Sequence, residues 1–513
     1  MPRLPVVGSD SNTWGATLND FLSQAHNADG SIKNLFFNPK DPAYGAKLDN
    51  STDDTVAIQA AITAAGAAGG GIVWGSSGTG KISAPLNFSS PNVILAGPAG
   101  QAFTLTPTSG FTGANLVNIT ADFCGLKNIT LAGASTTYSS NPAADGIQIT
   151  GARSVTLENV YLNYINGWAV QSTATAGVAN YWNDWRNVHP FQCKQGFHIL
   201  GNTGSGFNMA HYLTDCCADQ IQNGDGYLFE DAHDILCTNL EGSVTAGSGN
   251  TLHIKGASAA VYVSNIDLGP APGPSTGACV LIESGANGNP KQVTFNAGIV
   301  EGGLTGITIT AGTQLRVVDV DIINNGTHGL SISGAADAIV ISGCLFNLNG
   351  STAGAARYDF QSSTTGHVEV NDCYFLTPQG SLTQQTNNAA NVTAGNVVFQ
   401  NDTFSGTGYT TANILLGFPK VIRACPGFNP LGNVSLAAVG ASPYSFPTKS
   451  TDMMYIFTAG TYSVVSLGGV ATGYVGTPTA AVPWTVRVPA GVTLAITYTV
   501  APTANTTVVA FSD

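Results

Sequence analysis

A short repeat of apolar and polar positions dominates the chain. Each copy is an apolar–polar–apolar strand, two turn residues and a second short apolar strand, and clear copies span residues 155–162, 235–240, 261–268 and 368–375. Alternation with a period of two is typical of β-strands. Self-similarity every 20–50 residues is typical of a solenoid. The pattern therefore predicts stacked parallel strands through the middle of the chain.

The second turn residue of each copy sets the length of the repeat. Its positions are separated by 28, 28, 24, 26, 54, 24, 29 and 29 residues, and 54 equals two repeats of 27. Only Asn, Asp and Gly occur there, the residues that best tolerate a left-handed backbone. Stacked about 4.8 Å apart, such side chains can hydrogen-bond from turn to turn. We therefore expect a parallel β-helix with a ladder along one edge, made of Asn159, Asn187, Asp215, Asn239, Asn265, Asp319, Gly343, Asp372 and Asn401.

The segments that flank the repeat predict other elements. Residues 14–24 form a short amphipathic helix that Thr13 can cap, and residues 53–65 form a second helix with an apolar stripe. Beyond Phe418 the repeat ends. Residues 484–488 and 494–500 then alternate as half-buried antiparallel strands do, and Pro489-Ala490-Gly491 joins them. These features predict a leader, a solenoid and a small C-terminal β-domain.

The start of the repeat region resembles the opening of pectate-lyase-superfamily β-helix proteins, and especially that of bacteriophage tail spikes. The motifs are Tyr-Gly-Ala-Lys-Leu-Asp at 44–49, Asp-Asp-Thr at 53–55, Ile-Gln-Ala-Ala-Ile at 58–62 and Gly-Gly-Gly-Ile-Val at 69–73. Leu48 and Asn50 stand where that family usually has Gly. The segment around Trp14 also resembles the start of phage tail fibres. The resemblance implies that the second helix plugs the first turn with Ile58 and Ile62.

The resemblance implies an all-β fold, a right-handed parallel β-helix solenoid. It would have a short N-terminal helical leader, a plug helix and a small C-terminal antiparallel β-domain. We expect a leader for attachment over residues 1–40, the β-helix with its plug over 41–417, and a domain for trimerisation or receptor binding over 418–513. The expected partners are a host surface polysaccharide, two further copies of the chain in a homotrimer, and a phage tail or baseplate through the leader. The expected location is the virion tail.

The amino-acid composition limits which classes of partner the chain can bind. The formal net charge is −13 and only 9% of residues are charged, which disfavours nucleic acid and suits an assembly that buries surface between subunits. No basic run would hold an anionic membrane, and no stretch approaches the roughly 18 apolar residues of a spanning helix. Residues 1–8 have no apolar core, so we expect no signal peptide and synthesis in the host cytoplasm.

The nine cysteines suggest neither a metal site nor a redox motif. They include no Cys-x-x-Cys pair and no zinc-type spacing with His. Several occupy apolar strand positions, as buried free thiols do. We therefore expect no metal and no cofactor.

An acidic file is the first candidate for catalysis. Two positions past the ladder, outward-facing residues should include Tyr161, His189, Cys217, Glu241, Asp267, Glu301 and Asp321. Acids on neighbouring turns would lie about 5 Å apart and acids two turns apart about 10 Å. These distances bracket the carboxyl separations of retaining and inverting glycosidases. We predict Glu241, Asp267, Glu301 and Asp321 as catalytic residues; the alternative is a solvated or subunit-facing acidic stripe.

Aromatic residues and a second polar cluster supply the other candidates. Tyr161 and His189 would bind substrate beside the acids. Tyr181, Trp182 and Trp185 form either a sugar-stacking platform or part of the core. The residues Asp225, Glu230, Asp231, His233 and Asp234 form either a second site or an ordinary polar loop. A lyase would need a cation near its acids, and the region offers Arg186, Lys194, Lys255 and Arg316.

Three hypotheses about function follow. The first is a tail-spike depolymerase that cleaves a host polysaccharide, by hydrolysis rather than elimination. The second is a receptor-binding tail fibre that grips a glycan without cleaving it. The third is a free pectinase-like glycosidase or lyase. Fold alone does not separate them, because the site decides function.

Overall fold

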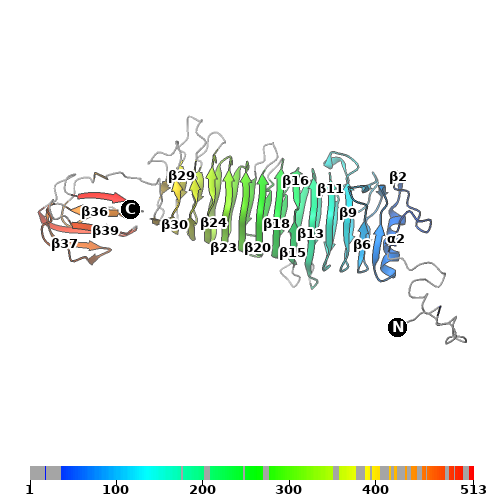
Figure 1. The fold of residues 1–513 in the computed structure, drawn as a ribbon, viewed down its shortest axis with the longest axis horizontal. Helices are drawn as coiled ribbons and strands as arrows, with labels where there is room; N and C mark the ends of the chain where they lie inside the picture. The colour runs from blue at the N-terminus through cyan, green and yellow to red at the C-terminus, as the bar shows by residue number, and fades with distance from the viewer. Residues whose placement is uncertain are drawn as a thin grey trace.

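The computed structural model is a long solenoid with a plug helix at one end, followed in sequence by a β-sandwich-like C-terminal region (Figure 1). The structure describes residues 18, 36–174, 177–201, 208–245, 249–269, 277–350, 358–376, 388–392, 396–404, 415–417, 421–423, 434–435, 441–446, 453–457, 459–479, 484–489, 491–500 and 508–512. The predicted leader helix lies outside these residues, apart from Leu18.

Each turn of the solenoid contributes to three parallel sheets. In one turn, strand β18 (His233–Val244) bends at Asn239, and strand β19 (Leu252–Lys255) completes the circuit. We call the three sheets upstream (the part before the bend, here 233–238), downstream (the part after it, here 240–244) and closing (here β19). β18 pairs in parallel with β15, β16 and β20, and β19 with β17 and β21. The right-handed parallel β-helix predicted from the repeat is confirmed.

The strands divide among the sheets as follows. The upstream sheet contains β1 (Phe36–Phe37), β3 (Gly71–Trp74), β6 (Val93–Ala96), β15 (Asn208–Thr214), β27 (His367–Asn371), β30 (Asn396–Gln400) and β33 (Val421–Arg423). The downstream sheet contains β2 (Asp49–Asp53), β4 (Gly78–Ile82), β7 (Phe103–Pro107), β16 (Cys217–Ile221), β25 (Leu345–Asn347), β28 (Tyr374–Phe375) and β31 (Thr403–Phe404). The strands that bend from the first into the second are β9 (Gly125–Ala132), β11 (Thr156–Asn163), β13 (Asn180–Phe191), β18, β20 (Ala259–Gly269) and β22 (Lys291–Glu301).

The closing sheet is the third wall. It contains β5 (Leu86–Phe88), β8 (Asn115–Ile119), β10 (Asp145–Thr150), β12 (Trp168–Thr173), β14 (Gln195–Leu200), β17 (Tyr227–Glu230), β19, β21 (Ala278–Glu283), β26 (Tyr358–Ser362), β29 (Asn388–Val392) and β32 (Leu415–Gly417). Two long strands begin in this sheet: β23 (Thr305–Ile323) continues through the other two sheets, and β24 (His328–Ser342) continues into the upstream sheet.

The Asn/Asp/Gly ladder is confirmed. All nine predicted members have a left-handed backbone, with φ between 50° and 67°. Side chains also bond from turn to turn: Asn159 Nδ2 donates to Asn128 Oδ1 over 2.9 Å, and Asn239 Nδ2 donates to Asp215 Oδ1 over 2.7 Å. The ladder thus begins one turn before the predicted start. Ala297, with φ 63°, fills the turn that the 54-residue gap left open.

One continuous apolar core fills the solenoid. Similar side chains stack in neighbouring turns, as Phe346 and Phe375 do with ring centroids 4.7 Å apart and planes 3° from parallel. Seven of the eight cysteines that the structure describes are buried free thiols, and Cys217 is half-buried. Burial raises the pKa of Cys193 to about 12, so this thiol stays protonated at neutral pH. The interpretation of the cysteines as core residues is confirmed for these positions.

Helix α2 (Thr55–Ala67) closes the first turn, as the resemblance implied. Ile58, Ala61, Ile62 and Ala65 are buried against the strands. Asp54 precedes the helix, but its carboxylate accepts hydrogen bonds from the Lys47 and Leu48 amides rather than capping the helix.

The segment before α2, which includes the start of β2, explains the departures from the family pattern. Leu48 and Asn50 both have a left-handed backbone, with φ 52° and 60°. Gly adopts this conformation without strain, which accounts for the usual Gly at these positions.

The C-terminal region folds around its own core of Phe446, Met453, Tyr455, Phe457 and Tyr462, with further apolar residues. One antiparallel sheet contains β34 (Val434–Ser435), β41 (Val508–Ser512), β36 (Met453–Phe457) and β39 (Trp484–Val488). The other contains β35 (Tyr444–Ser445), β40 (Leu494–Val500), β37 (Thr461–Leu467) and β38 (Val470–Ala471). The predicted strands are correct, but they do not pair with each other: β39 pairs with β36, and β40 with β37.

Candidate functional site

The predicted acidic file exists on the downstream sheet, with one correction. Glu241 of β18 pairs directly with Asp267 of β20, and both side chains are exposed. Asp267 pairs with Ile299, and Ile299 pairs with Asp321. Ile299 therefore holds the position expected for Glu301, which lies two residues further along β22 beside Ile323. The ladder of this turn is Ala297, a residue that the Asn/Asp/Gly pattern does not detect.

The file continues as predicted on the other side of Glu241. Tyr161 pairs with His189 in the next strand, and their ring centroids lie 6.0 Å apart. Cys217 pairs with Glu241. Burial and the neighbouring Glu241 carboxylate raise the pKa of the Cys217 thiol well above its usual value, so it is no nucleophile at neutral pH.

The two tryptophans of β13 face opposite ways. Trp185 is fully buried and stacks on Phe197, with ring centroids 6.0 Å apart. The expectation that it contacts a sugar is wrong, and its alternative as a core residue holds. Trp182 is 59% exposed and meets the Tyr181 ring edge-on at 4.8 Å. Positions 182 and 185 are an odd number apart, so a strand turns them to opposite faces.

The second predicted cluster divides between surfaces. Asp225 lies two residues before the start of β17 and Glu230 ends it, so both lie at the closing sheet. His233 and Asp234 lie on β18 in the upstream sheet, beyond the corner. Asp231 is buried at that corner, where its carboxylate accepts hydrogen bonds from the Ala257 amide and the Asn287 side chain. Only Asp225 and Glu230 are thus available for a site on one face.

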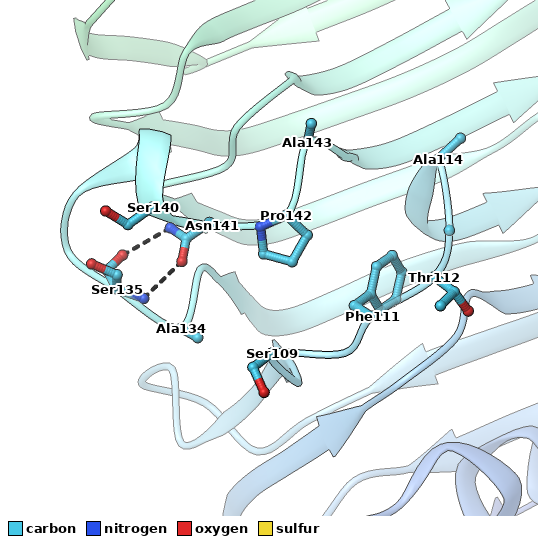
Figure 2. Close-up of a pocket in the computed structure, with 11 residues that line it drawn as sticks. Ser109, Phe111, Thr112, Ala114, Ala134, Ser135, Ser140, Asn141, Pro142 and Ala143 are labelled. Atoms are coloured by element: carbon cyan, nitrogen blue, oxygen red, sulfur yellow. Dashed lines mark hydrogen bonds between the residues drawn. The ribbon is translucent and has the colours of Figure 1, made fainter.

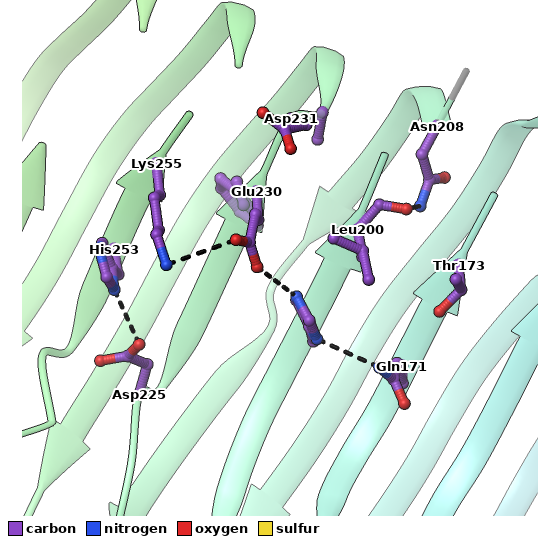
Figure 3. Close-up of polar contacts among 12 residues, drawn as sticks. Gln171, Thr173, Leu200, Asn208, Asp225, Glu230, Asp231, His253 and Lys255 are labelled. Atoms are coloured by element: carbon purple, nitrogen blue, oxygen red, sulfur yellow. Dashed lines mark hydrogen bonds and ion pairs between the residues drawn. The ribbon is translucent and has the colours of Figure 1, made fainter. Parts of the chain in front are cut away.

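These two acids are part of a larger group that sequence reasoning did not assemble. The closing-sheet cluster consists of Gln171, His198, Asp225, Glu230, His253, Lys255 and Glu283, from five neighbouring turns. Gln171, Asp225, Glu230, His253 and Lys255 are labelled in Figure 3. Strand pairing places Gln171 beside His198, and Glu230 beside Lys255, which in turn pairs with Glu283. The cluster therefore lies on the outer face of the solenoid, across several turns.

Glu230 is the electrostatic centre of the cluster. Its Oε2 lies 3.4 Å from His198 Nε2 and its Oε1 lies 3.4 Å from Lys255 Nζ. The close contact with His198 is the largest cause that lowers the pKa of Glu230, to about 2; burial opposes it, and the charge of Lys255 lowers the pKa further. Its side chain is 26% exposed, so this permanent anion is accessible to a ligand.

His253 joins two further carboxyl groups. Its Nδ1 lies 2.9 Å from Asp225 Oδ2, and its Nε2 lies 3.2 Å from Glu283 Oε1. A neutral imidazole has one donor and one acceptor nitrogen, so His253 can donate to one carboxylate and accept a hydrogen bond from the other carboxyl group when that group carries a proton. The His253 side chain is 10% exposed, whereas that of Glu283 is 34% exposed. Glu283 is thus the member of this group that a ligand can reach.

Asp145 borders the cluster on its N-terminal side. Its Oδ1 accepts a hydrogen bond from the Trp168 amide over 2.7 Å, and the Trp168 ring lies 4.7 Å from the His198 ring. Burial raises the pKa of Asp145. Three strand steps, about 14 Å, separate it from the level of Asp225, and Glu230 lies five residues further along the chain, so the Asp145 and Glu230 carboxyls cannot act on one bond.

A neutral pocket lies at the N-terminal part of the same sheet (Figure 2). It has a volume of about 760 Å³ and is lined by the loops that precede β8 and β10. Phe111 and Pro142 supply apolar surface, while Asn141 fixes one loop through hydrogen bonds with the Ser135 backbone. The lining contains no titratable side chain, which suits binding rather than chemistry.

Metal and membrane sites can be addressed for the described part of the chain. Within it, no group of three or more His, Cys, Asp or Glu side chains is arranged to hold a metal ion. None of the helices in the described ranges is long and apolar enough to cross a membrane.

The comparison with protein families decides the affiliation. The model of the family described as rhamnogalacturonase A/epimerase, pectate lyase-like, matches residues 36–374, about two thirds of the chain. The chain belongs to this family. The match spans the closing-sheet cluster and the acidic file of this pectate-lyase-like protein. No curated protein matches the chain.

Solved structures share the fold at low identity. The A-module of mannuronan C-5 epimerase AlgE6 from Azotobacter vinelandii is 18% identical, with a TM-score of 0.52 over 76% of this chain and 98% of that one. The N-terminal fragment of bacteriophage Phi29 gene product 12 is 15% identical, with a TM-score of 0.54 over 76% and 70%. The Dettilon tailspike protein gp208 is 12% identical, with a TM-score of 0.52 over 99% and 95%.

Proposed function

We propose that this protein is a phage tail spike that binds a host surface polysaccharide and hydrolyses it at the closing-sheet cluster. The observation that carries the proposal is Glu230, an accessible carboxylate kept ionised by His198 and Lys255. A long solenoid face with charged side chains on successive turns suits a linear polymer. The fold that the chain shares with the Dettilon tailspike protein over 99% of its length supports the phage role.

Two carboxyl groups take the catalytic roles. Glu230 and Glu283 stand two strands apart on one file, about 10 Å at the backbone, which approaches the spacing of inverting glycosidases. Glu230, ionised before the reaction, accepts a proton from a water molecule as that water attacks the anomeric carbon. Glu283, in its protonated form, gives a proton to the leaving oxygen, and His253 positions it. The step leaves Glu230 protonated and Glu283 ionised, and proton exchange with solvent restores both. The bond from the anomeric carbon to the leaving oxygen breaks as the bond to water forms.

The downstream acidic file is the competing site. Glu241 and Asp267 are direct neighbours, about 5 Å apart at the backbone, which is the spacing of a retaining pair. Glu301 and Asp321 would extend that surface, and Tyr161 and His189 would bind sugar beside it. We place this site second because its two central acids are exposed and have no cation on the neighbouring file positions.

Elimination is the second candidate reaction, and Lys255 favours it. Its ammonium lies 3.4 Å from Glu230 and is 33% exposed. In a polymer of uronic acids, a cation at this position would stabilise the carboxylate of the sugar while a base removes the adjacent proton. Hydrolysis and elimination leave different products, so one reaction mixture separates them.

The assembly belongs to the same proposal. We expect a homotrimer with roughly parallel solenoids, attached to a phage tail or baseplate through the leader. The low fraction of charged residues supports buried surface between subunits. Light scattering at micromolar concentration tests this directly, because a mass near the 52.4 kDa of one chain contradicts the trimer.

The test of function uses purified full-length protein and surface polysaccharide extracted from candidate host bacteria. New reducing ends without ultraviolet absorbance indicate hydrolysis, and new ends that absorb indicate elimination. Adsorption without new ends on any preparation contradicts the catalytic proposal and leaves a receptor-binding fibre. Glu230→Gln and Glu241→Gln, measured side by side, identify which face cleaves.

A further inference from the structure

A groove crosses the outer face of the upstream sheet, on a different wall of the solenoid from the closing-sheet cluster. Its volume is about 740 Å³, and it extends over five successive strands, β20, β22, β23, β24 and β27. Four strand steps correspond to about 19 Å, a length that several sugar rings would fill. Neither the acidic file nor the predicted aromatic group belongs to this groove.

The register explains the hollow shape. Tyr262, Thr294, Arg316, Val340 and Glu369 occupy one file across the five strands. Thr294 and Val340 are the short side chains of this file, and they lie on either side of Arg316. The hollow therefore runs along the solenoid axis, as a bound polymer strand would.

Tyr262 gives the groove an aromatic end. Its side chain is 48% exposed, and the file continues beyond it through Leu236 and Tyr212, which are 42% and 41% exposed. Three adjacent turns therefore present exposed apolar side chains in one file along the axis. An aromatic ring with a polar tip suits the mixed apolar and hydroxylated face of a sugar.

Arg316 gives the groove a free cation. It is exposed, and within the described residues it has no ion-pair partner, whereas Arg153 and Arg186 each pair with an Asp. The chain has 17 Lys and Arg against 30 Asp and Glu, so an unpaired guanidinium in a groove is a distinctive local feature. The planar guanidinium matches a carboxylate through two parallel hydrogen bonds.

Neutral and paired groups complete the lining. Gln292 and Gln314 lie on adjacent strands at left-handed bends and offer amide donors and acceptors along one rim. Glu369 brings a negative charge to the far end, but His367 Nε2 lies 2.9 Å from its Oε1. Arg316 thus remains the one cation in the groove without an anionic partner among the described residues.

We propose that this groove is a second, non-catalytic binding site for an acidic polysaccharide strand, one that carries carboxylates on its sugars. Tyr262 stacks on a sugar ring and Arg316 binds a carboxylate further along the strand. The proposal rests on the proposed function for the class of ligand but adds a site that adsorbs without cleaving. The upstream sheet would then bind the polymer, and the closing sheet would hydrolyse it.

The experiment measures binding of the full-length protein to immobilised alginate and polygalacturonate, with dextran as the neutral comparison. We expect binding to both acidic polymers that weakens as salt rises, and a loss of at least about tenfold for Arg316→Ala and for Tyr262→Ala. Arg186→Ala, on the same sheet, and Tyr374→Ala, an exposed Tyr on the downstream sheet, are the matched controls and should bind as wild type does.

Each other outcome has a distinct meaning. Unchanged binding by both groove variants, or equal binding of dextran, overturns the site whether or not the protein cleaves. A smaller oligomer for Tyr262→Ala or Arg316→Ala also overturns it and assigns the face to contact between copies of the chain. Absent cleavage alone contradicts only the proposed hydrolysis, because binding to the immobilised polymers is measured independently of bond cleavage.

Discussion

His198 holds Glu230 from one side of the closing sheet while Lys255 holds it from the other, each at 3.4 Å. The contact with His198 crosses from β14 to β17, and the contact with Lys255 crosses from β17 to β19. Three successive turns therefore fix one carboxylate on the outer surface. Such an arrangement is pre-organised, because both side chains are in place before any ligand arrives.

The first prediction concerns this carboxylate. Glu230→Gln keeps the size of the side chain but removes the charge that activates water, so cleavage should fall by at least about a hundredfold. Reducing-end release from host polysaccharide measures it. Glu241→Gln is the matched control, because it makes the same change on the downstream sheet. If Glu241→Gln abolishes cleavage and Glu230→Gln does not, the downstream file is the active face.

The second prediction follows from Asp402, a buried carboxyl near the C-terminal end of the solenoid. Burial raises the pKa of Asp402 to about 8, although the Cys373 and Gln400 amides donate to it. An unfolded Asp has a pKa near 3.8, so between about pH 4 and 8 the folded chain holds the extra proton. Stability should therefore fall as pH rises through this window.

Thermal unfolding at pH 5 and pH 8 measures this fall in stability with rising pH. Glu230 adds no slope in that range, because its lowered pKa places its own effect below about pH 4.5, where stability is lost as the carboxylate becomes protonated. Asp402→Asn should flatten the dependence, whereas Asp319→Asn, an exposed ladder change, should keep it. An equal slope in wild type and Asp402→Asn contradicts the assignment.

The tryptophans of β13 give a third prediction. Trp185→Ala removes a fully buried ring from the core and should lower the free energy of unfolding by about 3–5 kcal/mol. Trp182→Ala removes an exposed ring and should leave stability within about 0.5 kcal/mol. Denaturant unfolding measures both. A weaker adsorption of Trp182→Ala to host polysaccharide would support its predicted role in binding.

The sequence predicted the solenoid because the bend imposes a chemical requirement. The bend requires a left-handed backbone, which Asn, Asp and Gly tolerate best, and Asn and Asp also hydrogen-bond to the next turn. These residues recur often enough along the sequence to give the length of the repeat. Ala297 escaped detection because its backbone satisfies the bend without the characteristic side chain. The position of Glu301 was consequently misjudged by two residues. Trp185 was misplaced for a simpler reason, because strand parity was not applied between positions 182 and 185.

The closing-sheet cluster was harder to predict. Asp225, Glu230 and Lys255 were each recognised as polar candidates, but His198, His253 and Glu283 were not joined to them. Loops of different length separate the downstream and closing strands, so the ladder period does not carry over to the third strand. Residues 195–200, 227–230 and 252–255 each alternate as a strand does, and aligning these three segments would have placed His198 level with Leu228 and Leu228 level with His253.

The last prediction tests the ladder through Asn239. Its Nδ2 donates to Asp215 Oδ1 and its Oδ1 accepts from Asn265 Nδ2, each over 2.7 Å, while its own φ is 55°. Asn239→Ala removes both bonds and puts a residue without local polar support in the left-handed region, so we expect a loss of about 2–3 kcal/mol. Asn239→Gly removes the same bonds but tolerates the backbone, so it should lose about 1–2 kcal/mol less than the Ala variant. Denaturant midpoints of the two variants separate the conformational part from the hydrogen-bonding part. Equal losses would mean that the bonds alone stabilise the bend, and a greater loss for Gly would contradict the role of the left-handed backbone in selecting the ladder residues.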